Sequence, residues 1–407
     1  MEYSKVGKYY EVFSGYAFKS QDLKETADIP IIKIGNISNG RNVINENMQF
    51  VSKELLGINK KYYVNRGDVL LSLTGSHMNQ PNSVVGRSCR NYSDRLYLLN
   101  QRAGKIVPKN NASLSYIYYV LQTQAMKEMI CCRAYGAANQ VNVSPKSIMS
   151  IKWNFPSSDV QHSIASILST YDTLIENNTK RIRLLEKMAE NLYKEWFSYG
   201  KIIKGGTIVR LTDIIQITRG LSYSTAEIDC EEGLDLINLK NIQAYGGFRY
   251  DGTKKFCGKY KNEQIVCEGD LVMGVTDMTQ DRRTVGSVAL IPKTDKLSVI
   301  SADLIKISSS ISSVFLFGMF KYGNVSKYVA QFANGANVLH LRPKALHNIK
   351  VLLPNPNLIN KYVDIVSPMV AEMNKLYVLS EKLARQRDLL LPRLMSGKLE
   401  VKEELLE

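Results

Sequence analysis

The 407-residue sequence predicts an α+β protein made of two tandem, pseudo-repeated α+β domains that are separated by two long helices. The helices are expected to pair with each other as an antiparallel coiled coil. Three observations predict this architecture. One stretch of sequence recurs at the end of each half of the chain, the excess positive charge is confined to two blocks, and each block is followed by a neutral segment with a heptad repeat.

The recurring stretch occurs first as GAANQVNVSPKSIMSIKWNFP at residues 136–156 and again as GANVLHLRPKALHNIKVLLP at residues 335–354. Each copy has a glycine turn, a Pro-Lys pair and an apolar run that ends in proline. The first prolines, Pro145 and Pro343, lie 198 residues apart, and so do the final prolines of the two copies. A nearly constant offset of this length is typical of a duplicated domain.

The correspondence extends back toward the start of each half. KVGKYYEVFSGYAFKS at 5–20 matches RLTDIIQITRGLSYST at 210–225 in its apolar pattern, and RGDVLLSLTGS at 66–76 matches EGDLVMGVTDM at 268–278. Short β-type runs bounded by Gly, Asn and Pro precede one helical stretch in each half, which predicts an α+β fold for both copies. The expected domains are 1–156 and 201–354, and the expected helical regions are 157–200 and 355–407.

Length and composition exclude several classes of protein. At 407 residues the chain is too long for one ordinary core, and no apolar run reaches the roughly 18 residues that a membrane-spanning helix needs. The amino-terminal sequence has no apolar segment of the secretory type, so we expect a cytoplasmic protein. The six cysteines form no Cys-x-x-Cys pair and do not gather with the four histidines. We therefore expect neither a zinc site nor a disulfide framework.

The net charge of +15 is unevenly distributed along the chain. Residues 1–171 carry a net charge of +9 and residues 201–368 carry +6, whereas 172–200 and 369–407 are each neutral. A basic block indicates a polyanionic partner such as nucleic acid. A solvated basic surface without a partner is the alternative that charge alone leaves open.

Residues 172–197 and 373–399 predict the two long helices. In the first, seam residues recur at steps of three and four, and Thr173 and Glu176 have the spacing of a capping box at its start. The apolar stripes are narrow, which favours pairing of the two helices over packing of each against its own domain. A helix of about 26 residues is about 39 Å long, close to the roughly 34–36 Å between DNA half-sites one turn apart. The predicted seam residues are Ile175, Asn178, Ile182, Leu185, Ala189, Leu192, Trp196, Leu376, Leu379, Leu383, Leu390 and Leu394.

This arrangement resembles the specificity subunit of a Type I restriction–modification system. The resemblance rests on the paired glycine-to-proline stretches, the paired Gly-Asp-apolar runs and the closing RDLLLPRLMSGKLEV at 387–401. The last is similar to that family's closing LLPxLxSGK. The resemblance covers essentially the whole chain, although the first helix has NLYKEWFSYGKI at the place where the second has this motif.

The resemblance implies a function. In that family two target recognition domains each bind one half of an asymmetric, bipartite sequence in double-stranded DNA. Two methyltransferase (modification) subunits dock on the helices, and restriction/translocase subunits join the larger complex. S-adenosylmethionine, ATP and Mg²⁺ would then be bound by those partner subunits rather than by this chain.

The sequence shows no chemistry of its own. It has neither a cofactor loop with a catalytic Asn-Pro-Pro-aromatic motif nor a P-loop, so we expect no catalytic residues, no metal site and no bound cofactor. Two alternatives to sequence-specific DNA recognition stay open: a pseudosymmetric protein-interaction scaffold and an RNA-binding adaptor. Salt dependence and preference for duplex DNA separate these functions.

The candidates for DNA contact are polar and basic side chains, most of them in the loops. Base edges are read by Arg, Lys, Asn and Gln, with Ser and Thr in support, and solvated surface is the alternative for each residue taken alone. In the first domain the candidates for base contact are His77, Asn79, Gln80, Asn82, Arg133, Asn139 and Gln140. In the second they are Thr279, Gln280, Arg282, Arg283, Asn334 and Asn337. The candidates for phosphate contact are Lys19, Arg41, Lys60, Lys61, Arg249, Lys254 and Lys255.

Overall fold

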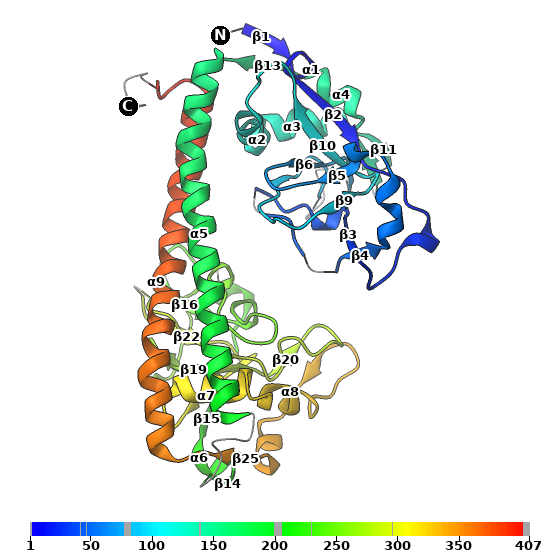
Figure 1. Ribbon diagram of the computed structural model, residues 1–407. Helices are drawn as coiled ribbons and strands as arrows, with labels where there is room; N and C mark the ends of the chain where they lie inside the picture. The colour runs from blue at the N-terminus through cyan, green and yellow to red at the C-terminus, as the bar shows by residue number, and fades with distance from the viewer. Residues whose placement is uncertain are drawn as a thin grey trace. The chain divides into compact units, whose positions relative to one another are not determined.

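The computed structural model describes residues 2–40, 42–45, 47–76, 83–137, 140–198, 206–228, 230–294 and 296–401. The chain divides into two compact units (Figure 1). Unit 1 consists of Met1–Asn177 and Ser380–Glu407, and unit 2 consists of Asn178–Leu379. Two helices of 40 residues, α5 (Ser158–Phe197) and α9 (Pro356–Met395), each contribute one part to unit 1 and the other part to unit 2.

Unit 1 is built on two four-stranded sheets. The first contains, in spatial order, β2 (Tyr10–Ser14), β10 (Ala103–Pro108), β6 (Val69–Ser72) and β8 (Ser88–Arg90), all antiparallel. The second contains β4 (Gln49–Val51), β3 (Ile29–Ile32), β9 (Tyr97–Leu99) and β5 (Tyr63–Val64), with a parallel central pair. The smaller sheets are β1 (Glu2–Lys5) with β13 (Lys152–Phe155), and β11 (Tyr135–Ala137), β12 (Gln140–Asn142) and β7 (Thr74–Gly75).

Unit 2 repeats the order and direction of both four-stranded sheets. The first contains β15 (Gln216–Arg219), β23 (Leu304–Ser308), β19 (Leu271–Gly274) and β21 (Val288–Leu290). The second contains β17 (Lys254–Phe256), β16 (Leu234–Ile237), β22 (Ser298–Ile300) and β18 (Ile265–Val266), again with a parallel central pair. The smaller sheets are β14 (Thr207–Arg210) with β25 (Lys350–Leu353), and β20 (Thr276–Asp277) with β24 (Leu339–His340). The shared topology confirms the predicted α+β class and the duplicated fold.

Short helices occupy equivalent places in the two units. Unit 1 has α1 (Val6–Tyr9), α2 (Leu114–Gln122), α3 (Gln124–Cys131) and α4 (Pro145–Met149), and unit 2 has α6 (Leu211–Ile214), α7 (Ser313–Lys321) and α8 (Val325–Ala330). The 3-10 turns are η1 (Ser20–Asp22), η2 (Ile34–Asn36), η3 (Lys53–Gly57), η4 (Lys60–Tyr62), η5 (Thr225–Glu227), η6 (Leu239–Asn241), η7 (Tyr250–Gly252), η8 (Asn262–Gln264) and η9 (Pro343–Asn348). Both α2 and α7 begin at a serine, Ser113 or Ser312, whose side chain accepts a hydrogen bond from a backbone N–H of the first turn.

Glycines explain part of the recurring sequence. A Cβ on Gly15 would lie 2.2 Å from the carbonyl oxygen of Leu99, and one on Gly220 would lie 2.0 Å from that of Ser301. Each strand β2 or β15 therefore leaves its sheet at a point where only glycine fits. The recurring stretch itself begins in both copies with a glycine at positive φ, +134° at Gly136 and +154° at Gly335.

One core in each unit joins the first sheet to both long helices. In unit 1, Ile106 of the sheet and Tyr116 of α2 share a buried cluster with Leu168 of α5 and Leu394 of α9. In unit 2 the corresponding cluster contains residues from β19, β23, α7, α5 and α9. Burial of each large apolar side chain contributes about 1.5–3 kcal/mol to folding. Each unit therefore holds its own part of the helix pair against its own sheet.

The first long helix is longer than the sequence predicted. It begins at Ser158 rather than at 172, so the predicted capping box at Thr173 is wrong, because that residue lies inside the helix. The early turns carry no coiled-coil repeat, since Ile164 and Leu168 are buried in the core of unit 1. At 1.5 Å per residue each helix of 40 residues is about 60 Å long rather than about 39 Å.

The two long helices pack together antiparallel, as predicted (Figure 1). In unit 1 the amino-terminal part of α5 meets the carboxy-terminal part of α9 at the ion pair between Asp172 and Arg387. In unit 2 the later part of α5 meets the earlier part of α9 at the ion pair between Arg181 and Glu372, whose atoms are 2.9 Å apart. The two pairings run in opposite chain directions, which defines the antiparallel arrangement.

Eleven of the twelve predicted seam residues are buried or half-buried. The buried ones are Asn178, Ile182, Ala189, Leu376 and Leu394, and the half-buried ones are Ile175, Leu185, Leu192, Trp196, Leu383 and Leu390. Leu379 is the exception, because its side chain is 47% exposed. After Leu376 the inward face of α9 continues through Ser380, which is half-buried. The inward positions are therefore Leu376, Ser380 and Leu383, a step of four residues followed by a step of three, so Leu379 faces outward.

The structure contains one disulfide that the sequence did not indicate. Cys230 and Cys257 form a disulfide in unit 2, although they lie 27 residues apart in the sequence. A β-bridge between Ile228 and Phe256 brings the two segments together, and sequence spacing alone does not reveal this. Within the described part of the chain no group of His, Cys, Asp and Glu side chains is arranged to hold a metal ion. None of the described helices is long and apolar enough to cross a membrane.

Candidate nucleic-acid interface

The loop that follows β20 carries most of the candidates predicted for unit 2. Thr279 donates both its backbone N–H and its hydroxyl to the carboxylate of Asp277, each over 2.8 Å. Gln280 donates its side-chain amide to the carbonyl oxygen of Ala336 over 2.7 Å. Arg282 is exposed and has a left-handed backbone with φ of +52°. The loop is therefore ordered, and it presents Arg282 outward.

A second segment lies beside this loop. Residues 334–340 form a tight turn closed by two backbone hydrogen bonds between Asn334 and His340. The pairing of β20 with β24 and the bond from Gln280 to Ala336 join the turn to the loop after β20. Asn334 and Asn337 are exposed on this turn. The structure thus brings the predicted residues from 279–283 and 334–337 onto adjacent loops at one sheet edge.

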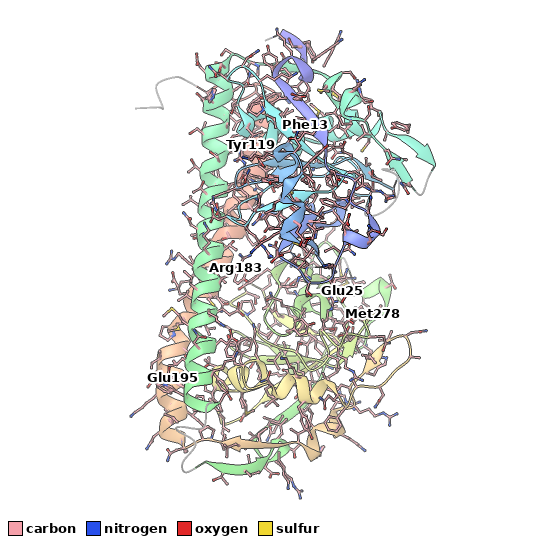
Figure 2. The ribbon with its side chains drawn as sticks, turned by 45° about the vertical axis from the view of Figure 1, so that its right-hand side comes forward. Phe13, Glu25, Tyr119, Arg183, Glu195 and Met278 are labelled. Carbon is pink, nitrogen blue, oxygen red and sulfur yellow. A yellow bond between two sulfur atoms is a disulfide. The ribbon has the colours of Figure 1, made fainter. Side chains whose placement is uncertain are left out.

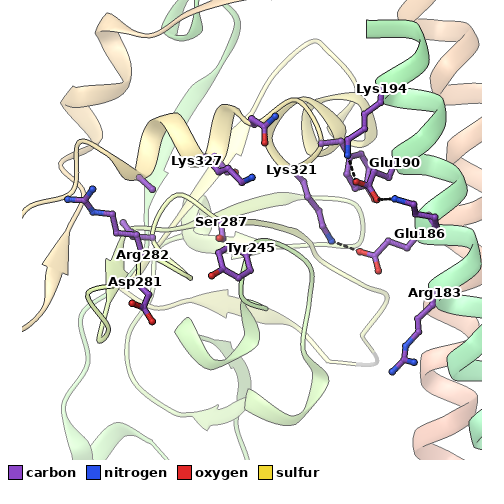
Figure 3. Close-up of a pocket in the computed structure, with 16 residues that line it drawn as sticks. Arg183, Glu186, Glu190, Lys194, Tyr245, Asp281, Arg282, Ser287, Lys321 and Lys327 are labelled. Atoms are coloured by element: carbon purple, nitrogen blue, oxygen red, sulfur yellow. Dashed lines mark hydrogen bonds and ion pairs between the residues drawn. The ribbon is translucent and has the colours of Figure 1, made fainter. Parts of the chain in front are cut away.

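A basic cleft opens next to this loop in unit 2 (Figure 3). Its volume is about 850 Å³, and it is lined by α5, by α7 and α8, and by the loops that contain Tyr245 and Arg282. The acidic lining residues are Glu186, Glu190 and Asp281, and the basic ones are Arg183, Lys187, Lys194, Arg282, Lys321 and Lys327. Figure 3 shows Asp281 and Arg282 on the opposite side of the cleft from α5.

The acidic residues of the cleft neutralise only some of its cations. Lys321 pairs with Glu186, and Glu190 accepts hydrogen bonds from Lys187 over 3.0 Å and from Lys194 over 2.5 Å. The bonds from Lys194 and then Lys187 lower the pKa of Glu190, so it stays ionised. Within the described residues, Arg183, Arg282 and Lys327 form no ion pair. A cleft lined by surplus charge of one sign concentrates oppositely charged ligands.

The equivalent sheet edge of unit 1 is β7 with β12 and β11. Thr74 of β7 donates its hydroxyl to the side-chain oxygen of Asn142 in β12 over 2.7 Å. Gln140 is exposed at the start of β12, and Arg133 follows α3, where it donates to the carbonyl oxygen of Met129 over 2.8 Å. Six further candidates of this unit lie outside the described residues: Arg41, His77, Asn79, Gln80, Asn82 and Asn139.

Three predicted phosphate contacts of unit 1 are exposed, and one of them lies over an aromatic ring. Lys61 lies over the ring of Tyr62 with its Nζ 4.9 Å from the centroid, and that ring contacts Tyr16 at 5.5 Å. Lys60 is exposed in the same turn, η4, and Lys19 is exposed at the start of η1. Flexible cations beside partly exposed rings suit contact with a nucleic-acid backbone.

The predicted phosphate contacts of unit 2 lie elsewhere than the cleft. Arg249 is held by Asp251 through two hydrogen bonds of 3.2 and 3.0 Å. Lys255 pairs with Asp235 on the neighbouring strand, and Lys254 is half-buried in β17. None of these three residues lines the cleft. Arg283 is likewise occupied, because it pairs with Asp281 at 2.5 Å.

Sequence reasoning missed the cations of the cleft. Arg183, Lys187 and Lys194 belong to α5, where alternating charges resemble the solvated faces of a coiled coil. Lys321 and Lys327 belong to α7 and α8 and carry no local signal. Only the tertiary fold brings these residues to Arg282. The local signal that was available is the net charge of +6 over residues 201–368.

Comparison with known proteins agrees with this structure. Residues 1–187 match the family model described as Type I restriction modification DNA specificity domain. The Type I restriction enzyme MjaIX specificity subunit of Methanocaldococcus jannaschii is 23% identical over 331 residues, which cover 75% of this chain and 73% of that protein. The HindI specificity subunit of Haemophilus influenzae is 22% identical over 382 residues, which cover 74% and 81%.

A solved structure supports the fold over nearly the whole chain. The crystal structure of the Type I restriction–modification S subunit from M. genitalium is similar with a TM-score of 0.60 and 14% identity, and the match covers 97% of this chain and 95% of that one. At this identity the likeness concerns the fold. With its two repeated units and paired helices, the chain is similar to the specificity subunits of Type I restriction–modification systems, in sequence over residues 1–187 and in fold over nearly its whole length.

Proposed function

We propose that the chain recognises an asymmetric, bipartite site in duplex DNA, with one recognition domain for each half of the site. The proposed domains are 1–156 and 201–354, joined by helical regions 157–200 and 355–407. The observation that carries the proposal is the sheet edge common to both units, β7 with β12 in unit 1 and β20 with β24 in unit 2. The sequences that follow β7 and β20 differ, so each is suited to a different half-site.

The second unit offers two kinds of DNA contact. The exposed polar side chains of the loop after β20 are of the types that bind base edges. The cations of the basic cleft lie beside that loop and provide a path for a phosphate backbone. In this proposal Arg282 contacts a base, whereas Arg183 and Lys327 contact phosphates.

The paired helices are proposed to set the spacing between the half-sites and to dock two methyltransferase subunits. Leu184 and Met188 support the docking role, because they lie one helical turn apart on α5 and are 65% and 52% exposed. Partner subunits would bind S-adenosylmethionine, ATP and Mg²⁺, and restriction/translocase subunits would complete the assembly. The proposed location is the cytoplasm, where the chain has access to DNA.

The test is to sequence methylated adenines in a host that carries this gene together with its partner subunits. We expect one bipartite motif whose methylation disappears when this gene is deleted. The purified chain should also bind a duplex with that motif more tightly than single-stranded RNA, with affinity that falls steeply as salt rises. Methylation that is unchanged by the deletion would refute the proposal. Preference for RNA would support an RNA-binding adaptor, and binding of neither would leave a protein-interaction scaffold.

A further inference from the structure

A single buried carboxylate fixes both ends of the loop that follows β20. Asp277 is 2% exposed. Its Oδ1 accepts hydrogen bonds from the N–H and the hydroxyl of Thr279, both at 2.8 Å. Its Oδ2 accepts hydrogen bonds from the N–H groups of Thr284 at 2.6 Å and Val285 at 3.2 Å. A carboxylate can accept all four bonds, and together they close the loop into a ring.

The middle of the loop is also held in place. The carbonyl oxygen of Arg283 accepts hydrogen bonds from the N–H of Tyr245 and the hydroxyl of Ser287, both at 2.8 Å. Gln280 ties the tip to Ala336 on the adjacent turn. A loop with this many attachments has little conformational entropy left to lose when a ligand binds. Its exposed side chains are therefore presented in a fixed arrangement.

Met278 is the most exposed large apolar side chain in the described part of the chain. It is 73% exposed and stands directly after Asp277, at the start of the ordered loop (Figure 2). Both ends of the loop are held by hydrogen bonds to Asp277, and the exposed side chain of Met278 is not packed in a hydrophobic core. Its neighbours Thr279 and Gln280 are polar, and Arg282 on the same loop lines the basic cleft. Met278 is thus an apolar side chain that lies among residues of the types that contact bases, next to the basic cleft. Such a side chain is suited to contact an apolar group on a DNA base.

We propose that Met278 determines part of the sequence specificity of unit 2 by contacting the 5-methyl group of a thymine in the major groove. This inference rests on the proposed function. The thymine methyl is the apolar group that the major groove displays, and apolar side chains recognise it there by contact. Asp277 acts as a positioning residue, because it holds the loop that carries Met278.

The test separates the methyl group from the rest of the base. The full chain selects duplexes from a randomised pool, and each thymine of the selected motif is then replaced by uracil, which lacks only the 5-methyl group. We expect one uracil substitution, in one half-site, to weaken binding by wild-type protein roughly four- to tenfold, as burial of one methyl group predicts. The Met278→Ala variant should bind the thymine and uracil duplexes equally.

Three further variants sharpen the result. Met278→Leu keeps an apolar side chain and should keep the preference for thymine. Ile208→Ala removes another exposed apolar side chain, 70% exposed on β14 in the same unit, and should leave the preference unchanged. Asp277→Asn should weaken discrimination in the half-site bound by unit 2 and leave that in the other half-site intact.

Each contrary outcome has one meaning. If Met278→Ala weakens all duplexes evenly and still prefers thymine, the side chain does not contact that methyl group and the inference is wrong. A half-site for unit 2 that contains no thymine on either strand would also overturn it. If wild-type protein selects no motif from the pool, the proposed function fails first, and this inference fails with it.

Discussion

Asp172 of α5 and Arg387 of α9 form an ion pair within unit 1, with 7% and 18% of their side chains exposed. The Tyr119 hydroxyl donates to the same carboxylate over 2.6 Å. Burial by itself would lower the pKa of Arg387, but Asp172 outweighs it and raises that pKa, so the pair stays charged. In unit 2 the rings of Tyr193 and Tyr362 join the same two helices, with centroids 5.7 Å apart. Unit 1 thus joins its parts of the two helices by a buried ion pair, whereas unit 2 joins its parts by an aromatic contact.

Asp172→Asn should destabilise unit 1 by about 1–3 kcal/mol, because it removes the buried partner of the Arg387 guanidinium and leaves only Asp388, which is 62% exposed. Urea unfolding followed by the fluorescence of Trp153, in a Trp196→Phe background, reports on unit 1 alone. The control is Lys53→Ala, which breaks an ion pair of unit 1 with Asp28 that is 74% and 46% exposed and should cost about 0–1 kcal/mol. A cost below 1 kcal/mol for Asp172→Asn would show that the buried pair does not stabilise unit 1.

Neutralising Arg183 and Lys327 should flatten the salt dependence of DNA binding. Each phosphate contact contributes about −0.9 to the slope of log affinity against log salt, so the Arg183→Gln, Lys327→Gln double variant should lose about two such contributions. The matched control is Lys361→Gln with Lys375→Gln, two exposed lysines of unit 2 that do not line the cleft. Equal slopes for the two double variants would remove the cleft from the DNA path.

The long-range repeat and the helix pairing were predictable because each produces a regular spacing of residues in the sequence. The offset between Pro145 and Pro343 reveals the duplication, and steps of three and four reveal the seam. The heptad pattern does not extend back to the start of α5, because Ile164 and Leu168 pack in the core of unit 1. Leu379 was wrongly placed in the seam, because the sequence does not show whether a step of three or a step of four residues follows Leu376.

The candidate site was predictable only where its residues are close in sequence. Thr279, Gln280 and Arg282 share one polar loop, so sequence alone grouped them. Grouping them with Asn334 required the pairing of β20 with β24. The cleft cations on α5 and the exposure of Met278 depend on packing between distant segments. Cys230 and Cys257 were missed for the same reason.

Unit 2 should lose stability in acid as Asp277 is protonated. Burial alone would raise the pKa of Asp277, but hydrogen bonds from Thr284 and Thr279 outweigh it and lower the pKa below the ordinary 3.8. A depressed pKa stabilises the folded state above the unfolded pKa, and this contribution is lost as pH falls through the folded pKa. At neutral pH Asp277→Asn should therefore cost about 1–3 kcal/mol, since its amide faces backbone N–H donors.

The same variant checks the sign of this effect. The stability of unit 2, followed by Trp196 fluorescence in a Trp153→Phe background, should differ most between wild type and Asp277→Asn at neutral pH. The difference should shrink as pH falls below about 4. A difference that stays constant down to low pH would mean that the charge of Asp277 does not order the loop.

Lengthening both helices by one heptad should change the gap in the recognised site and leave its two halves unchanged. Insertions after Asn177 and after Leu379 fall where the two units divide, so each unit keeps all of its own contacts. Seven residues add about 10 Å while the seam stays in phase, and at about 3.4 Å per base pair this corresponds to roughly three base pairs. The measurement is the methylated motif in a host that carries the variant. An unchanged gap would exclude the helices as the determinant of spacing.

Arg282 and Arg283 should behave differently, although they are adjacent. Arg282 is exposed and forms no ion pair within the described residues, whereas Arg283 is held by Asp281 at 2.5 Å. If Arg282 binds a guanine, Arg282→Ala should cost about 1–3 kcal/mol for the preferred base pair and relax preference at one position of one half-site. Arg283→Ala should change affinity little and leave every preference in place.

Binding to duplexes mutated in either half, at two salt concentrations, distinguishes base contact from phosphate contact. A lost phosphate contact weakens binding to all duplexes evenly and flattens the salt slope. Equal loss of discrimination in both halves would contradict independent recognition by the two domains.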